Sequence, residues 1–96
     1  MSCLHTINKS SDSKLLESCL NVIAAGDAIL FLEDGVYHCN SANTIRSIGE
    51  KVKVYGLRED ILARATLAKL DSKVEVVDNA KFVELCCEHA KVVSWF

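Results

Sequence analysis

Cysteine is the residue type in this chain with the widest chemistry, and the 96 residues include five cysteines. A thiolate is a strong nucleophile and metal ligand, whereas a buried thiol packs like a small apolar side chain. No two cysteines have the CxxC spacing of a redox or zinc motif, and their odd number argues against a disulfide framework. Each thiol therefore has to be judged on its own position, and the five are Cys3, Cys19, Cys39, Cys86 and Cys87.

Two of these thiols are candidates for a reactive role. Cys19 recurs with Leu16, Leu20 and Ile23 at helical spacing, so packing in the core is the main interpretation and a redox or nucleophilic role is the alternative. Cys39 directly follows His38, and a neighbouring imidazolium would lower the pKa of its thiol. Consecutive helical residues do not face each other, however, so adjacency alone does not pair them.

The other three cysteines are better explained by packing or by simple exposure. Cys3 begins a predicted strand and is expected in the core, and Cys86 lies on the apolar side of a predicted helix. Cys87 is one residue further round that helix and is expected to be exposed. With His89, this pair does not have the ligand spacing of a zinc site, so we expect no metal and no cofactor.

A pair of carboxylates, Glu33 and Asp34, follows the most apolar run of the chain. Such residues can act as acid and base or lie at an interface, but at a strand exit they more often stay solvated or cap a helix. Neither a GxGxxG nor a P-loop pattern is present, which argues against a nucleotide-dependent enzyme. A homo-oligomeric module that binds a small molecule near Lys9, Asp34 and Arg58 is a further alternative.

Strand-like and helix-like segments must position these residues, and they alternate along the whole chain. This alternation predicts one α/β domain over residues 1–96, a three-layer α/β/α sandwich with a mostly parallel sheet of four or five strands and flavodoxin- or Rossmann-like layering. Pattern does not give the strand order. The predicted strands are 3–7, 28–32, 51–57, 73–77 and 92–95.

The helices are predicted from apolar spacing and from capping residues. The first begins near Leu15, is capped by Asp12 or Ser13 and ends at Gly26; the second spans 37–48. The third spans 58–67 with a stripe of Ile61, Leu62 and Ala65, and the fourth is capped by Asp78 or Asn79 with Phe82, Val83, Cys86 and Ala90 on one face.

The amino-acid composition limits which classes of partner this chain can have. Half of the residues are hydrophobic, which is rich for a chain that can bury only about 60–65% of its unfolded surface, so we expect an oligomer. The net charge of −2 offers no basic footprint for nucleic acid. No signal peptide and no membrane-spanning run is present in the sequence, so a cytoplasmic protein is expected.

Several segments, taken in order, resemble the DsrH/TusB family, the small subunits of the DsrEFH and TusBCD sulfur-relay complexes in the DsrE-like superfamily. The resemblance implies a heterohexamer, a dimer of heterotrimers, with two DsrE-like partners (DsrE/TusD-like and DsrF/TusC-like) that receive sulfur from small carrier proteins. It implies delivery either to 2-thiouridine at the tRNA wobble position or to sulfur oxidation. The segments are LHTINKS at 4–10, LESCL at 16–20, ILFLEDGVY at 29–37, KVYGLREDILARA at 53–65, VVDNAKFVEL at 76–85 and Ser94-Trp95.

One departure from the family pattern indicates which role this chain has. In the catalytic relatives, the persulfide cysteine lies near the end of the third strand, but this chain has Val54-Tyr55-Gly56 there and no thiol in residues 57–60. The resemblance therefore implies an accessory subunit, with the relay cysteine on a partner. Cys19 in LESCL matches a cysteine of the DsrH branch, so a persulfide carried by Cys19 or Cys39 is the alternative. Aromatic residues are enriched at interface cores, which makes Tyr37, Trp95 and Phe96 the expected anchors.

Overall fold

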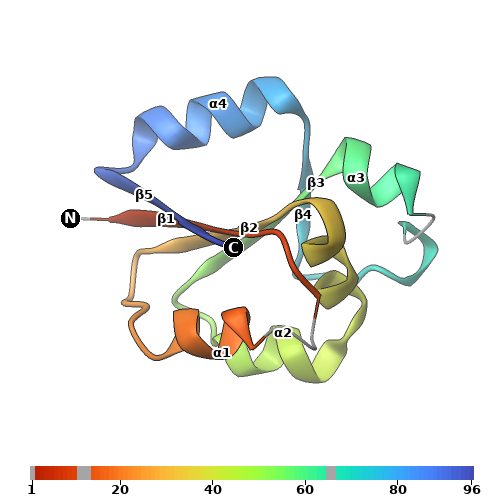
Figure 1. Ribbon diagram of the computed structural model, residues 1–96, viewed down its shortest axis with the longest axis horizontal. Coiled ribbons are helices and arrows are strands. Elements are labelled where there is room, and N and C mark those ends of the chain that lie inside the picture. Colours follow the sequence, from red (N-terminus) through yellow and green to blue (C-terminus); the bar gives the residue numbers. More distant parts are fainter. Residues whose placement is uncertain (1, 11–13, 65–66) are drawn as a thin grey trace.

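A single parallel sheet forms the centre of the computed structural model, which describes residues 2–10, 14–64 and 67–96. The strand order is β4-β3-β2-β1-β5, and every neighbouring pair is parallel (Figure 1). All four residues of the third strand in this order, β2, are buried, as a continuous apolar run predicts for a strand covered on both faces. The strands are β1 (Cys3–Ile7), β2 (Ala28–Phe31), β3 (Lys53–Leu57), β4 (Glu75–Val77) and β5 (Lys91–Trp95).

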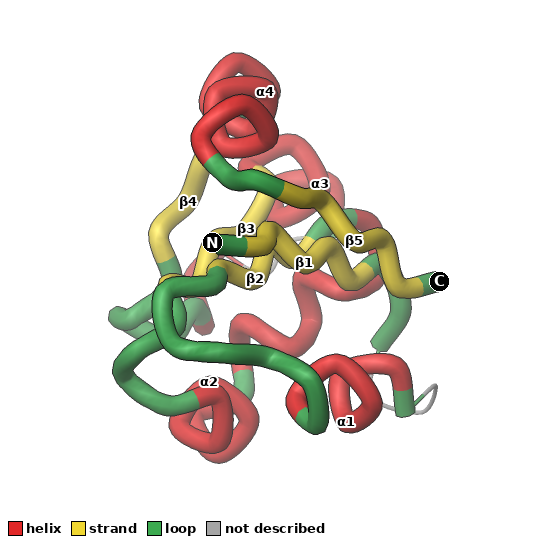
Figure 2. The backbone as a smooth tube through the Cα atoms, turned by 90° about the vertical axis from the view of Figure 1, so that its left-hand side faces the viewer, coloured by secondary structure: helices red, strands yellow, loops and turns green. Residues whose placement is uncertain are grey.

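Helices cover both faces of the sheet, which confirms the predicted α/β layering. Figures 1 and 2 show α1 and α2 on one face and α4 on the other, with α3 toward the carboxyl ends of the strands. Alternate residues of each strand supply two separate apolar cores, one containing Ile29 and Phe31 and the other Ala28 and Leu30. The helical elements are α1 (Leu15–Leu20), η2 (Glu33–Asn40, a 3-10 helix), α2 (Ala42–Ile48), α3 (Arg58–Ala63), η3 (Leu67–Lys69, 3-10) and α4 (Asn79–Glu88).

The helix predicted over 37–48 is wrong in its extent, because the chain forms two helices there. Ser41 is extended (φ −102°, ψ 107°), and its hydroxyl accepts a hydrogen bond from the amide of Thr44 at 3.3 Å. Ser41 is thus the N-cap of α2, and the cap separates it from η2. The predicted first helix also ends early, at Leu20 rather than Gly26, although Ile23 still packs against the core.

Two predicted apolar stripes are only half correct. In α3, Ile61 is fully buried but Leu62 is 51% exposed. In α4, Val83 is 62% exposed, and Leu85 is the residue that is buried beneath the helix. Asp78 caps α4 as predicted, accepting from the amide of Lys81 at 2.8 Å.

Some predictions fall on residues 11–13 and 65–66, which lie outside the described residues. These are the caps proposed at Asp12 and Ser13 and the inward position of Ala65. Within the described part of the chain, no helix is long and apolar enough to cross a membrane.

Candidate functional site

Open α/β folds place their sites at the carboxyl end of the sheet, and in this chain η2 and α3 lie at that end (Figure 1). Gly35 makes the placement of η2 possible. A Cβ at this residue would lie 2.0 Å from the carbonyl oxygen of Ile7, so only glycine lets η2 approach the end of β1. The amide of Leu32 donates to the same carbonyl at 3.1 Å. The backbone of η2 and of Leu32 therefore lies directly against the end of β1.

The end of β3 is closed as tightly by side chains. A Cβ at Gly56 would lie 2.8 Å from Cδ1 of Ile61 and 3.3 Å from the sulfur of Cys39. Ile61 is fully buried, so this contact is part of the core. Side-chain atoms of Ile61, Cys39 and Val74 thus enclose the space beside Gly56.

Cys39 is enclosed beside this closed end. Its side chain is fully buried, and that burial raises the pKa of its thiol to about 12. The pKa is raised and not lowered, so His38 does not activate this thiol as the sequence hypothesis required. The His38 ring donates through Nε2 to the carbonyl of Lys9 at 3.0 Å, and burial lowers the pKa of the imidazole, which favours its neutral form.

Cys19 is a residue of α1 and belongs to the same apolar core as Cys39. It is fully buried, and burial, followed by the charges of Cys3 and Asp27, raises the pKa of its thiol to about 12. The thiolate is the reactive form of cysteine, so this environment favours packing over nucleophilic chemistry in the folded chain.

The remaining thiols are more accessible. Cys3 is half-buried, and burial raises its pKa; Cys86 is half-buried against the core beneath α4; Cys87 is exposed. Among the described residues, no group of three or more histidine, cysteine or acidic side chains is arranged to hold a metal ion.

The acidic loop after β2 is tied to α3. Glu33 has a left-handed backbone (φ 50°), and its amide donates to a carboxylate oxygen of Asp60 at 2.7 Å. Arg64 donates through Nε to Asp34 at 2.9 Å and also lies 3.6 Å from Asp60. The hydrogen bond to Asp34 raises the pKa of Arg64, so the guanidinium stays charged. Asp34 thus has a structural partner, which leaves it poorly placed for acid–base catalysis.

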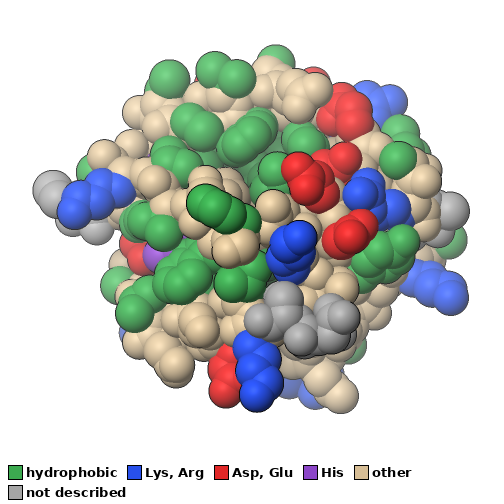
Figure 3. Space-filling view, viewed as in Figure 1, with side chains coloured by type: hydrophobic (Ala, Val, Ile, Leu, Met, Phe, Trp, Pro, Cys, Tyr) green, Lys and Arg blue, Asp and Glu red, His purple; other side chains and the backbone are tan. Residues whose placement is uncertain are grey.

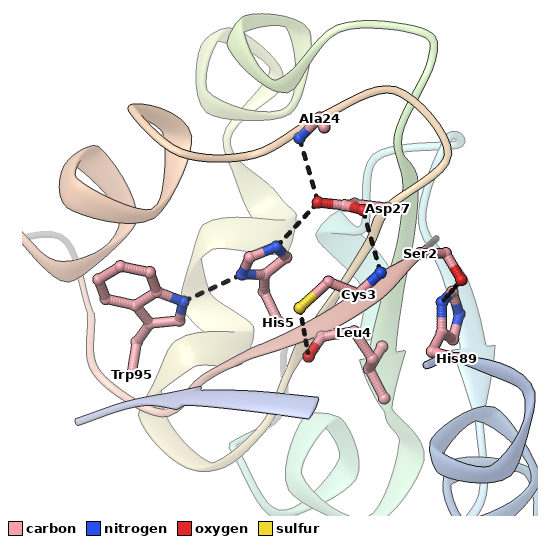
Figure 4. Close-up of polar contacts among 8 residues, drawn as sticks. All are labelled: Ser2, Cys3, Leu4, His5, Ala24, Asp27, His89 and Trp95. Atoms are coloured by element: carbon pink, nitrogen blue, oxygen red, sulfur yellow. Dashed lines mark hydrogen bonds and ion pairs between the residues drawn. The ribbon is translucent and has the colours of Figure 1, made fainter. Parts of the chain in front are cut away.

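A chain of buried polar groups links β1, β5 and the loop before β2, and the sequence analysis missed it (Figure 4). The indole N–H of Trp95 donates to Nδ1 of His5 at 3.2 Å, and Nε2 of His5 lies 3.1 Å from Asp27 Oδ2. An indole N–H can only donate, so Nδ1 accepts and the proton of the neutral ring is on Nε2, directed at Asp27. Trp95 was expected to be an interface anchor, but its indole N–H points into the protein and is bonded to His5.

Asp27 is almost fully buried and is held by three donors. The amides of Cys3 and Ala24 donate to its two oxygens at 3.0 and 3.1 Å, beside the contact with His5 (Figure 4). Burial alone would raise the pKa of Asp27, but these hydrogen bonds outweigh it and lower the pKa. The only sequence signal was an aspartate placed directly before a fully apolar strand.

The open hollows of the surface do not coincide with the predicted ligand residues. One, of about 260 Å³, lies between α1 and α2 and is lined by residues that include Lys14, His38 and Thr44. It contains none of Lys9, Asp34 and Arg58. This hollow therefore gives no support to the small-molecule alternative around these three residues.

Comparison with known proteins places the chain in a family. The family profile described as "DsrH like protein" matches residues 9–92. Proteins named "Protein TusB" from Pectobacterium parmentieri and from Escherichia coli (strain K12) are 32% and 30% identical over 94 residues, covering 96% of this chain and 99% of theirs. The solution structure of Protein Tm0979 from Thermotoga maritima superposes with a TM-score of 0.69 at 21% identity, covering 90% of this chain and 92% of that one, which supports the fold. This chain belongs to the DsrH/TusB family.

Proposed function

We propose that this chain is an accessory, non-catalytic subunit of a cytoplasmic sulfur-relay complex, in which a partner subunit carries the persulfide. The observation that carries the proposal is the closed end of β3, where Ile61 and Cys39 occupy the space beside Gly56. A persulfide-forming cysteine must present a thiolate to its donor and acceptor. The described cysteines nearest the apolar core, Cys19 and Cys39, are fully buried with pKa values raised to about 12.

The proposed partners are two DsrE-like subunits, related to DsrE/TusD and DsrF/TusC, in a heterohexamer that receives sulfur from small carrier proteins. Tyr37 on η2 and Leu62 on α3 are 46% and 51% exposed, and they lie on two elements that contact each other at the carboxyl end of the sheet. We place the contact with a catalytic partner there.

Co-expression with two DsrE-like proteins tests this assignment. The tagged chain is expected to retain both through purification and size-exclusion chromatography. Tyr37→Glu should release them, whereas Val22→Glu, which changes a residue 63% exposed in the loop after α1, should not. A tagged chain that elutes without either protein, although both are soluble, would refute the assignment.

Two destinations for the sulfur follow from the family, tRNA 2-thiouridine and sulfur oxidation. Deletion of the gene followed by nucleoside analysis of bulk tRNA separates them. Loss of 2-thiouridine identifies the tRNA branch; unchanged 2-thiouridine with impaired oxidation of stored sulfur identifies the other.

A second candidate role makes Cys19 a persulfide carrier in its own right, as its place in the LESCL segment favours. Because its thiol is fully buried, that role requires α1 to move away from the sheet before sulfur reaches it. Rapid alkylation of Cys19 in the assembled complex, but not in the isolated chain, would support this role.

A further inference from the structure

The two margins of the sheet differ in how they are protected. Edge strands expose unpaired backbone groups, and proteins usually blunt them with shortness, charge or proline. At one margin, β4 has only three residues and includes Glu75. At the other, β5 has five residues, and its only charged side chain is Lys91 at its start. Figure 2 shows β5 at the margin of the sheet beyond β1, and no described element pairs with its outer edge.

The backbone register shows which residues of β5 face outward. Ile7 bonds toward β2, because its carbonyl accepts from the amide of Leu32 at 3.1 Å. Alternate residues of a strand between two parallel neighbours bond to opposite sides, so Leu4 and Thr6 bond toward β5. With Leu4 paired to Val92 and Thr6 to Ser94, the ladder to β1 uses the backbone groups of residues 91, 93 and 95. The amides and carbonyls of Val92 and Ser94 therefore point away from the sheet.

Two apolar side chains lie along this outer edge, at equal spacing on either side of Ser94. Val92 is 44% exposed and Phe96 is 82% exposed. Val92 lies two residues before Ser94 and Phe96 lies two residues after it, so all three side chains share one face of the extended chain. Figure 3 looks onto this margin and shows hydrophobic side chains gathered across it, whereas acidic and basic side chains gather toward α3.

We propose that β5 pairs antiparallel with β5 of a second copy of this chain, about a two-fold axis at Ser94. Residues with outward backbone groups form the hydrogen-bonded pairs of such a ladder, so Ser94 would pair with Ser94 of the second copy and Val92 with Phe96 of the second copy. The two exposed apolar side chains then cover each other as a cross-strand pair. Residues 92–96 have no charged side chain, so no like charges meet within the paired stretch.

This self-pairing matches what closed symmetric dimers require. An isologous interface needs a surface that is complementary to itself, and equal spacing of Val92 and Phe96 about Ser94 provides it. The hydrogen bond between Trp95 and His5 holds the end of β5 against β1. This contact keeps β5 extended, as pairing with a second strand requires. The inference goes beyond the proposed function, since the pairing needs no other subunit.

Proline substitution gives a selective test. Ser94→Pro removes an outward amide but no bond to β1, and proline is tolerated on edge strands in this orientation. Sedimentation velocity over a concentration series should show a dimer for the wild-type chain and for Ser94→Ala. Ser94→Pro should weaken dimerisation by about tenfold or more, since two ladder bonds are lost across the axis. Slow amide exchange at Val93, which bonds to β1, should persist in all three and establish that β5 remains folded.

The register is tested by a charge exchange between Val92 and Phe96. Val92→Lys and Phe96→Glu should each weaken self-association, because each places one charge opposite an apolar side chain. Mixing the two variants should restore a heterodimer, in which Lys at 92 faces Glu at 96 of the other copy. A wild-type chain that stays monomeric at millimolar concentration, a dimer that Ser94→Pro leaves intact, or a mixture that does not associate would overturn the proposal.

Discussion

Trp95 and His5 are separated by ninety residues in sequence and joined by a hydrogen bond of 3.2 Å from the indole N–H to Nδ1. Their rings lie 6.3 Å apart at 28°, in a stacked arrangement. Through His5 the bond continues to Asp27, so the last strand, the first strand and the loop before β2 are held by one buried polar chain. These hydrogen bonds hold β5 against β1 at the edge of the sheet.

Removing the indole at one end of this series, or the imidazole at its centre, should lower stability by different amounts. Trp95→Phe deletes one hydrogen bond and should cost about 1 kcal/mol in the free energy of unfolding. His5→Leu also leaves the buried Asp27 carboxylate without its side-chain partner and should cost about 3 kcal/mol. Urea denaturation measures both. Equal losses would show that the Asp27 contact adds nothing.

Acid should destabilise the protein through Asp27. Its pKa is lowered in the folded state, so its contribution is fully present above the unfolded pKa of about 4. That contribution is lost as pH falls through the folded pKa. Asp27→Asn should therefore be less stable than wild type at pH 7 and should lose less stability between pH 5 and pH 2. Parallel pH profiles for the two proteins would contradict this assignment.

Thiol reactivity should follow burial. At pH 8, iodoacetamide should modify Cys87 first, whereas Cys19 and Cys39, with pKa values raised to about 12, should react only when the chain unfolds. Peptide mass spectrometry after timed alkylation ranks all five. Modification of Cys19 at the rate of Cys87 would show that α1 opens readily.

Gly35 should be intolerant of any side chain. Gly35→Ala places a Cβ against the carbonyl of Ile7 and should cost about 3 kcal/mol by displacing η2. Gly26→Ala is the matched control, because its φ is +90° but no atom lies within 4 Å of the new Cβ, so only backbone strain of about 1 kcal/mol applies. Thermal unfolding of both variants compares the two effects; a smaller loss for Gly35→Ala would contradict the close approach.

The sequence predicted the layers well because alternating strand and helix patterns repeat along the chain. β1 was predicted with its observed bounds, and β2 differed by one residue, since Leu32 lies just past the strand. Helix boundaries were less predictable. The separation of η2 from α2 depends on a single capping hydroxyl at Ser41, whose role is visible only once Thr44 is placed.

The sites that were missed depend on contacts between distant residues. The residues around His5 and Trp95 in the sequence do not indicate that the two side chains pair. The indole N–H reaches His5 because β5 lies beside β1 in the sheet. Leu62 was assigned to the core because α3 has an apolar stripe, but this short helix contacts the fold mainly through Ile61. The absence of a thiol after β3 could be read from the sequence, but the contact of Ile61 and Cys39 with the space beside Gly56 could not.

Persulfide mapping on the reconstituted complex distinguishes an accessory chain from a persulfide carrier. After incubation with a persulfide donor, intact-mass and peptide analysis should find an adduct of about 32 Da, one sulfur atom, on a cysteine of a DsrE-like partner and on no cysteine of this chain. Transfer should also survive when Cys19 and Cys39 are both replaced by alanine or serine in a variant that still assembles. An adduct on Cys19 or Cys39 that turns over to the acceptor, or loss of transfer in that variant, would contradict the account.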